Sequence, residues 1–189
     1  MPRSIVIFVR LTDRLNHGVG RFAMYLLFVL MAILLWSTVS KAVFTPSLWT
    51  LEMAQFLMVA YYILGGPYSM QLGSHVRMDL VYAGWSDRRR AWWDAFTVLL
   101  LIFYLCILLW GAVESTVYSL KLSFVPTEVV WLPFELPVPQ TGFLERSPTA
   151  WRPYLWPIKL VMCVGFVLMI LQSLSFLFRD IATLRGETI

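Results

Sequence analysis

Four long apolar segments constrain this chain more than any other feature. They cover about residues 22–44, 49–72, 92–118 and 156–178. A helix needs about 20 mostly apolar residues to cross a hydrocarbon layer of ~30 Å at a rise of 1.5 Å per residue. Charged residues make up only 14% of the chain, too few to give a water-soluble domain of this size its polar surface. The sequence therefore predicts an all-α integral membrane protein, residues 1–189 forming one membrane domain with four transmembrane helices.

The distribution of Lys and Arg predicts how the chain is oriented. With the N-terminus inside, ten of the fifteen basic residues fall on the cytoplasmic side, and cytoplasmic loops are usually richer in them. The short inner loop with Arg88, Arg89 and Arg90 carries most of this bias, and Trp92 and Trp93 behind it are typical of an interfacial aromatic belt. We expect both termini in the cytoplasm. The net charge of +4 flanks apolar segments, so it does not indicate a nucleic-acid partner.

The N-terminal segment allows two interpretations. Arg3, Arg10, Arg14, His17 and Arg21 recur at a helical spacing, which is typical of an amphipathic helix that lies on the lipids of the inner leaflet before turning into the first span. The alternative is an ordinary basic flank that sets topology. The apolar stretch that follows is too long for a secretory signal, so we expect it to remain as an anchor.

Two connections between the spans differ in character. The hairpin Thr45-Pro46-Ser47 is short, so the first two helices should be antiparallel neighbours. The outer loop, about residues 119–155, holds six of the ten prolines and cannot form a continuous helix. Its aromatic content is high, with Phe124, Trp131 and Phe134 among others, so we expect it to pack on the membrane surface or on a partner protein.

The centres of the spans hold no ionisable residue, which speaks against a catalytic or ion-pumping site. Glu52 and Lys41 lie near the outer surface; we expect a structural pair or simple solvation, with ion handling as the alternative. Cys106 and Cys163 lie within separate apolar segments and indicate neither a disulfide nor a metal site. The sequence predicts no catalytic, cofactor or metal residue.

The segment from Gly65 to Leu80 is the most informative part of the chain. Gly65-Gly66-Pro67 would either kink the second span or allow close helix packing, and we favour packing. Beyond the span, His75, Arg77 and Asp79 alternate with apolar residues. This pattern favours a hydrogen-bonded turn docked against another protein. The alternative is a solvated loop with an ordinary ion pair, worth ~1 kcal/mol or less.

These motifs together resemble the small membrane subunit of tripartite ATP-independent periplasmic (TRAP) transporters, over about residues 15–180. Many members carry a second acidic residue beside the glutamate of the second span, where this chain has Leu51 and Met53. The outer loop and the Gly-Gly-Pro-Tyr segment look closest to the branch often labelled mannitol/chloroaromatic-type. The matching features, in chain order, are Trp49 and Glu52 opening the second span, Gly73-x-His75-Val76-Arg77-x-Asp79 after it, the basic patch Arg88-Arg89-Arg90, and Trp151 to Lys159 before the last span.

The resemblance implies a division of labour. A periplasmic solute-binding protein captures a carboxylate-type solute, and a large membrane subunit moves it in an elevator-like manner driven by sodium. The small subunit braces the large one in a bacterial inner membrane and is not an enzyme. Sodium would then bind the partner subunit, not this chain, and the solute cannot be named from this sequence. His75, Arg77 and Asp79 would dock the partner or stabilise their loop, while Trp49 and Glu52 would anchor the outer end.

Two alternatives belong to other functional classes. A four-helix membrane redox or enzyme subunit would need buried His, Cys or acidic clusters. A small self-sufficient exporter would usually need a carboxylate near the middle of the membrane. The spans contain neither feature, so both are less well supported than a scaffold.

Overall fold

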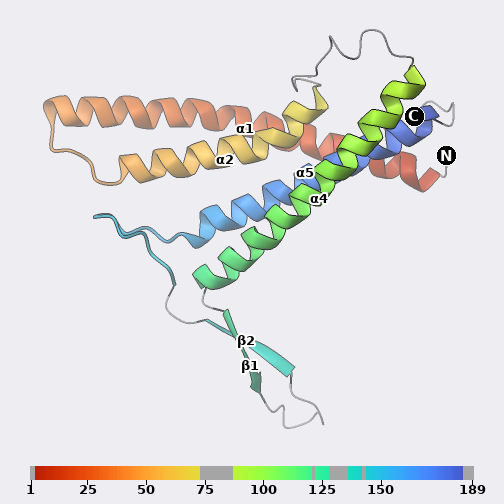
Figure 1. The fold of residues 1–189 in the computed structure, drawn as a ribbon. Coiled ribbons are helices and arrows are strands. Elements are labelled where there is room, and N and C mark those ends of the chain that lie inside the picture. Colours follow the sequence, from red (N-terminus) through yellow and green to blue (C-terminus); the bar gives the residue numbers. More distant parts are fainter. Residues whose placement is uncertain (1–2, 73–86, 121, 128–135, 142–143, 185–189) are drawn as a thin grey trace.

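The computed structural model describes residues 3–72, 87–120, 122–127, 136–141 and 144–184. Within these ranges the chain forms four α-helices and a β-hairpin (Figure 1). The helices are α1 (Arg3–Val43), α2 (Thr50–Gln71), α4 (Asp87–Leu120) and α5 (Trp156–Leu184). The strands are β1 (Leu122–Thr127) and β2 (Leu136–Thr141). All four expected spans are therefore helical.

Three of these helices, α1, α5 and the Trp92–Leu120 part of α4, are long and apolar enough to cross a membrane. Helix α2 has 22 residues, so its length of about 33 Å also suffices. Its composition is more polar because it contains Glu52, Gln55, Gly65-Gly66-Pro67 and several tyrosines. A membrane crossing by α2 therefore stays a prediction.

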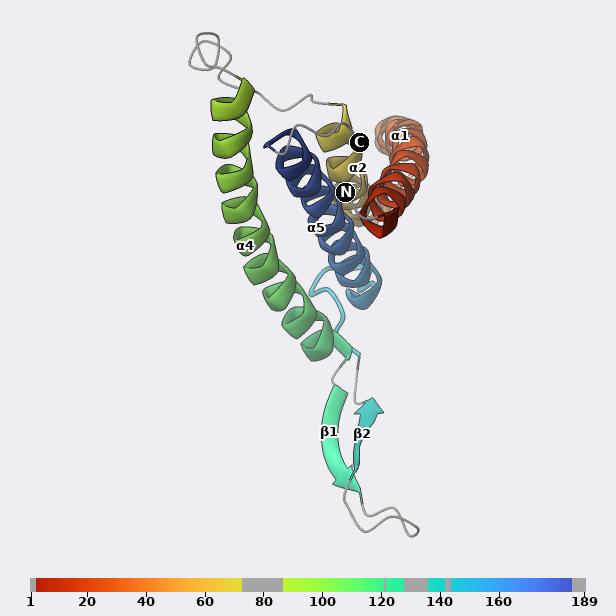
Figure 2. The ribbon, with the colours of Figure 1, turned by 90° about the vertical axis from the view of Figure 1, so that its right-hand side faces the viewer.

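The helices alternate in direction, and α5 lies between α4 on one side and the α1–α2 pair on the other (Figures 1 and 2). Helix α5 packs on all three other helices, whereas the main contact of α4 among the described elements is with α5. As the short connection predicts, α1 and α2 are neighbours. The start of α1 and the end of α5 lie at the same end of the bundle (Figure 1). We call this the inner end and the opposite one the outer end.

The interior of the bundle is built from few and mainly small side chains. Most large apolar side chains face outward, as expected of helices that lie in lipid. The helices approach closely where glycine removes a side chain, a common device in membrane bundles. A Cβ added to Gly165 would lie 2.0 Å from Cγ2 of Ile63, and one added to Gly20 would lie 2.3 Å from Cβ of Tyr68. The buried apolar residues are Val9, Ala23, Ala54, Met70, Leu105, Ala112, Leu168 and Ala182.

Helix α1 is continuous over 41 residues, or about 60 Å. The expectation of a turn between an N-terminal interfacial helix and the first span is therefore wrong. The reason is packing: Val9, Thr12 and Asn16 are buried on one stripe of the N-terminal half, and Phe8 meets Phe178 of α5 edge to face. The five residues of the basic stripe, from Arg3 to Arg21, are all exposed, so their contact with lipid headgroups stays a prediction.

Helix α2 runs without interruption through Gly65-Gly66-Pro67, and Pro67 is buried within it. A Cβ added to Gly66 would come within 3.2 Å of the sulfur of Met169 on α5. This close approach agrees with the packing interpretation of the glycine pair.

The outer loop is not a continuous helix, as its prolines predict, but it contains a β-hairpin that we did not expect from the sequence. Strands β1 and β2 pair antiparallel, with Leu122 opposite Thr141 and Thr127 opposite Leu136. The sheet has two strands, so each has a free edge on which proline is tolerated. Three prolines lie in it, at positions 126, 137 and 139. The hairpin extends away from the helices at the outer end (Figure 2).

Candidate functional site

Polar side chains of the described chain form a cluster at each end of α5, and Ser37, Ser47 and Thr50 form a smaller group where α1 connects to α2. No group of three or more His, Cys, Asp or Glu that could hold a metal ion was found among the described residues. Cys106 and Cys163 are free thiols in this part of the chain.

The inner cluster joins α1 to α5 through Asp13, Asn16, Gln172, Ser175 and Arg179. Gln172 is its centre: its Oε1 accepts a hydrogen bond of 2.6 Å from Nδ2 of Asn16, and its Nε2 donates one of 3.1 Å to Oδ1 of Asp13. Ser175 also donates to Oδ1 of Asp13, and Arg179 forms an ion pair with Oδ2. Asp13 and Asn16 are three residues apart on α1, and Ser175 and Arg179 follow Gln172 by three and seven residues on α5. These spacings place each set on one face of its helix, so the two sets can meet.

Burial makes these hydrogen bonds important for the stability of the fold. Asn16 and Gln172 are both 0% exposed, and an unsatisfied polar group in such a place is costly. Oδ1 of Asn16 has no partner within the described ranges. The Asp13–Arg179 pair is partly exposed, with 23% and 41% of the side-chain surface accessible, so we expect it to contribute less than the buried amides.

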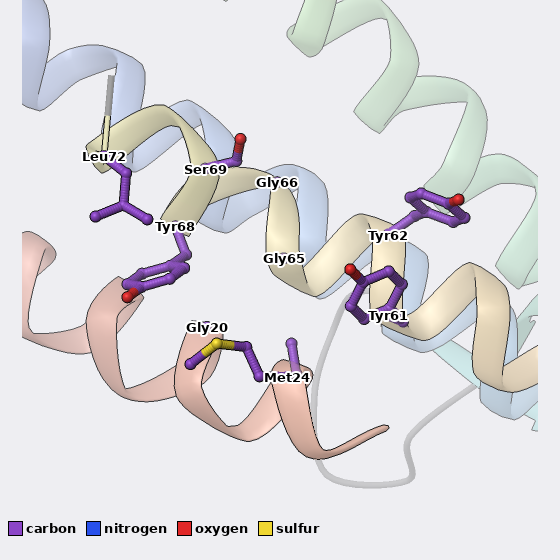
Figure 3. A pocket seen from close by; sticks show the side chains of 10 residues that line it. Gly20, Met24, Tyr61, Tyr62, Gly65, Gly66, Tyr68, Ser69 and Leu72 are labelled. Carbon is purple, nitrogen blue, oxygen red and sulfur yellow. The ribbon is translucent and has the colours of Figure 1, made fainter. Parts of the chain in front are cut away.

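Helix α2 joins the inner cluster at its last turn. Nε2 of Gln71 donates a 2.7 Å hydrogen bond to the backbone oxygen of Asp13. One turn earlier, the ring of Tyr68 packs against His17, with 5.3 Å between centroids. In the close view, Tyr68 lies beside the turn of α1 that carries Gly20 (Figure 3). The cluster therefore holds α1, α2 and α5 together at the end of α2. The chain continues from there into the segment with His75, Arg77 and Asp79, which we call the His75 loop.

The outer cluster ties the segment after the hairpin to the helix ends. Glu145 accepts a hydrogen bond from Ser119 at the end of α4 and pairs with Nζ of Lys159 at 2.8 Å. Lys159, in the first turn of α5, also donates to the backbone oxygen of Ser115 at 3.3 Å. Nearby, Arg146 lies over the ring of Tyr154 and donates to its hydroxyl.

Glu52 belongs to this outer region but not to the pair expected for it. It is 4% exposed, and its Oε1 lies 3.5 Å from the hydroxyl of Ser147. Lys41 is exposed, and the described chain contains no ion pair between these two residues. The expectation of a Lys41–Glu52 contact is wrong because α2 turns Glu52 inward, toward the outer loop. Oε2 of Glu52 has no partner in the described structure.

The other residues predicted for the site are only partly covered by the structure. Trp49 precedes α2, is 38% exposed and makes no side-chain capping bond. Arg89 is exposed on the first turn of α4. The side chains of Arg88 and Arg90 lie outside the described residues, as do His75, Arg77 and Asp79. The inner cluster was not predicted from the sequence, although Gln172, Ser173 and Ser175 interrupt an otherwise apolar span.

The ion pair of the outer cluster predicts a pH dependence. The hydrogen bond from Lys159, then that from Ser119, lowers the pKa of Glu145 below its ordinary value, although partial burial opposes this. An acid whose pKa is lowered by folding stabilises the folded state above the ordinary value of 4.5, and this contribution is lost as the pH falls through the lowered pKa. We expect Glu145→Gln to lower the unfolding temperature in detergent at neutral pH. The difference from wild type should shrink below pH 4.5; a constant difference would contradict the pair.

Comparison with protein-family models assigns most of the chain to a family. Residues 30–183 match the family model described as "Tripartite ATP-independent periplasmic transporters, DctQ component". This range includes α2, α4, nearly all of α5, the outer third of α1 and the segment with His75, Arg77 and Asp79. The comparison with curated proteins found no match.

Proposed function

The chain belongs to the DctQ family, the small membrane component of tripartite ATP-independent periplasmic transporters, and from this membership we propose that it is a non-catalytic scaffold for the transporter's large membrane subunit. The proposal places it in a complex with that subunit, which is served by a periplasmic solute-binding protein. It is a multi-pass membrane protein, and we propose the bacterial inner membrane as its location, with both termini in the cytoplasm.

One observation carries the scaffolding role. Several buried polar side chains of the described helices bond across helix boundaries, as in the inner cluster where Gln172 bridges Asn16 and Asp13. A transport site needs groups that can release such bonds and take up a solute or an ion near the membrane centre. Polar groups that already bond one helix to the next stabilise the arrangement of the helices, which is what a scaffolding subunit requires.

The finer parts of the proposal concern the partners. We propose that the large subunit works by an elevator-like movement driven by sodium, that sodium binds that subunit instead of this chain, and that the solute is an organic acid. A rigid small subunit supports this arrangement because an elevator needs a stationary frame against which the moving part can slide.

The test is co-purification followed by reconstitution in two compositions. The chain should co-purify with the large subunit of its own transporter. In proteoliposomes the two together, supplied with the binding protein and a sodium gradient, should take up solute, and this chain alone should take up none. Uptake or turnover by the chain alone would contradict the scaffold and favour a self-sufficient exporter or an enzyme. Failure to co-purify would contradict the assignment of the partner.

The His75 loop predicts a separate result. Arg77→Ala should reduce recovery of the large subunit, and with it transport, several-fold, because we propose that this loop docks the partner. Solute binding by the soluble protein should be unchanged. Arg10→Ala is the matched control, since Arg10 is a basic, exposed residue of α1 and is not among the residues predicted for docking. Equal recovery with both variants would show that Arg77 has no docking role of its own.

A further inference from the structure

Helix α2 leaves one face without a partner in this chain. All of its exposed residues, Leu51, Gln55, Met58 and Tyr62, lie on a single stripe, and Gly65, Ser69 and Leu72 continue that stripe toward the inner end. The spacing alternates between four and three residues, the repeat by which one helix packs along another. The opposite faces of α2 already contact α1 and α5. We call these seven residues the α2 seam.

The seam is too polar to face lipid. Gln55, Tyr62 and Ser69 recur every seven residues, and no hydrogen bond within the described chain reaches the Gln55 amide or the Tyr62 hydroxyl. Tyr62 is 67% exposed and lies in the middle part of α2, about 18 Å from its first residue and about 14 Å from its last. If α2 crosses the membrane as predicted, the hydrocarbon at that depth offers no hydrogen-bond partner, and a polar group exposed to it is costly.

The seam also borders a groove that a helix could enter. The groove between α1 and α2 has a volume of about 400 Å³ and is lined by four seam residues, Tyr62, Gly65, Ser69 and Leu72, together with Gly20 and Met24 of α1. In Figure 3 the Tyr61 and Tyr62 rings stand at one end and Tyr68 and Leu72 at the other, with Gly65 and Gly66 between them. A Cβ added to Gly65 would touch nothing within 4 Å, so this opening is not filled from within the chain.

We propose that the α2 seam is the docking face for an uncharged transmembrane helix of the large membrane subunit. This inference rests on the proposed function and adds the contact surface to it. The chemistry of the seam selects the occupant: it bears no charge, since the one acidic or basic residue of α2, Glu52, is buried on another face. Its hydroxyl and amide groups require hydrogen-bonding side chains or backbone opposite them. An acyl chain has none, whereas a helix with Ser, Thr, Asn or a small residue has.

The experiment uses the co-expressed complex. Gly65→Leu should fill the groove, leave the unfolding temperature of the small subunit close to that of wild type, and reduce recovery of the large subunit at least tenfold. Gly111→Leu is the matched control, because a Cβ at Gly111 on α4 also meets nothing within 4 Å while lying on a different face of the bundle. It should recover the large subunit as wild type does.

A second variant tests the hydrogen bonds without adding bulk. Tyr62→Phe keeps the ring and removes the hydroxyl, and it should weaken association about threefold, the usual size of one hydrogen bond between membrane helices. Unchanged association in both Gly65→Leu and Tyr62→Phe would overturn the proposal and place lipid on the seam. If these variants abolish self-association of this chain while the large subunit still binds, the seam binds a second copy of this chain and the proposal is wrong. If wild type itself fails to bind the large subunit, the proposed function fails instead.

Discussion

Replacing Gly165 by alanine should destabilise the chain by about 1–3 kcal/mol, the usual cost of overpacking a tight interface. The new methyl group would overlap Cγ2 of Ile63 at 2.0 Å and crowd its backbone oxygen at 3.2 Å. The Ile63 side chain could rotate, but the carbonyl can move only with α2. The α2–α5 contact must therefore widen. Unfolding in detergent, followed by tryptophan fluorescence or circular dichroism, would measure the loss.

Gly111→Ala provides the comparison for this prediction. It makes the same chemical change in a helix of the same bundle, at a position where the added carbon meets nothing. Alanine favours helix over glycine by up to about 1 kcal/mol, so this variant should be as stable as wild type or more so. Equal stability of the two variants would mean that α2 and α5 do not approach at Gly165 as closely as the structure shows.

Replacing Gln172 by leucine should cost about 1–3 kcal/mol, because it leaves buried polar groups without partners. The volume is nearly conserved, so packing alone accounts for little of this loss. Asn16 would lose its 2.6 Å hydrogen bond and Asp13 would lose one of its donors. The same unfolding measurement applies, and the helix content at low temperature should be unchanged.

The double variant Asn16→Leu/Gln172→Leu separates the hydrogen bond from its surroundings. Removing both partners leaves no stranded amide at the α1–α5 contact, so the double variant should lose less stability than the two single variants added together. Strict additivity would show that Asn16 and Gln172 are not coupled, and the inner cluster would then be no more than two neighbouring polar residues.

The helices could be predicted well from the sequence because they depend on local properties. Twenty-residue apolar segments, proline content and a three-residue connection predict the four helices and the antiparallel α1–α2 pair without knowledge of any tertiary contact. The same reasoning missed the β-hairpin. Strands with proline at positions 126, 137 and 139 contradict the usual strand composition, and two free edges are what make them tolerable.

The candidate site was harder to predict because it depends on residues far apart in the chain. Asp13 and Gln172 are separated by 159 positions, and nothing in their local sequence shows that α1 and α5 meet there. The Lys41–Glu52 expectation failed for the same reason: proximity across a short hairpin suggested a pair, but the rotation of α2 decides where Glu52 points. The polar positions of α2, by contrast, were visible from the start, and only the arrangement of the helices shows that several lie on one outward stripe.

The unbroken course of α1 has a mechanical consequence. Helix α1 is about 60 Å long, twice the thickness of the hydrocarbon layer, so it can act as a lever. If its outer half tilts by about 10°, a point about 30 Å beyond the pivot sweeps through about 5 Å. The basic N-terminal half is bound to the end of α5 through Phe178 and Arg179, so the two would swing as a unit. Any leaning of the outer half of α1 would thus be transmitted to the inner end of the bundle.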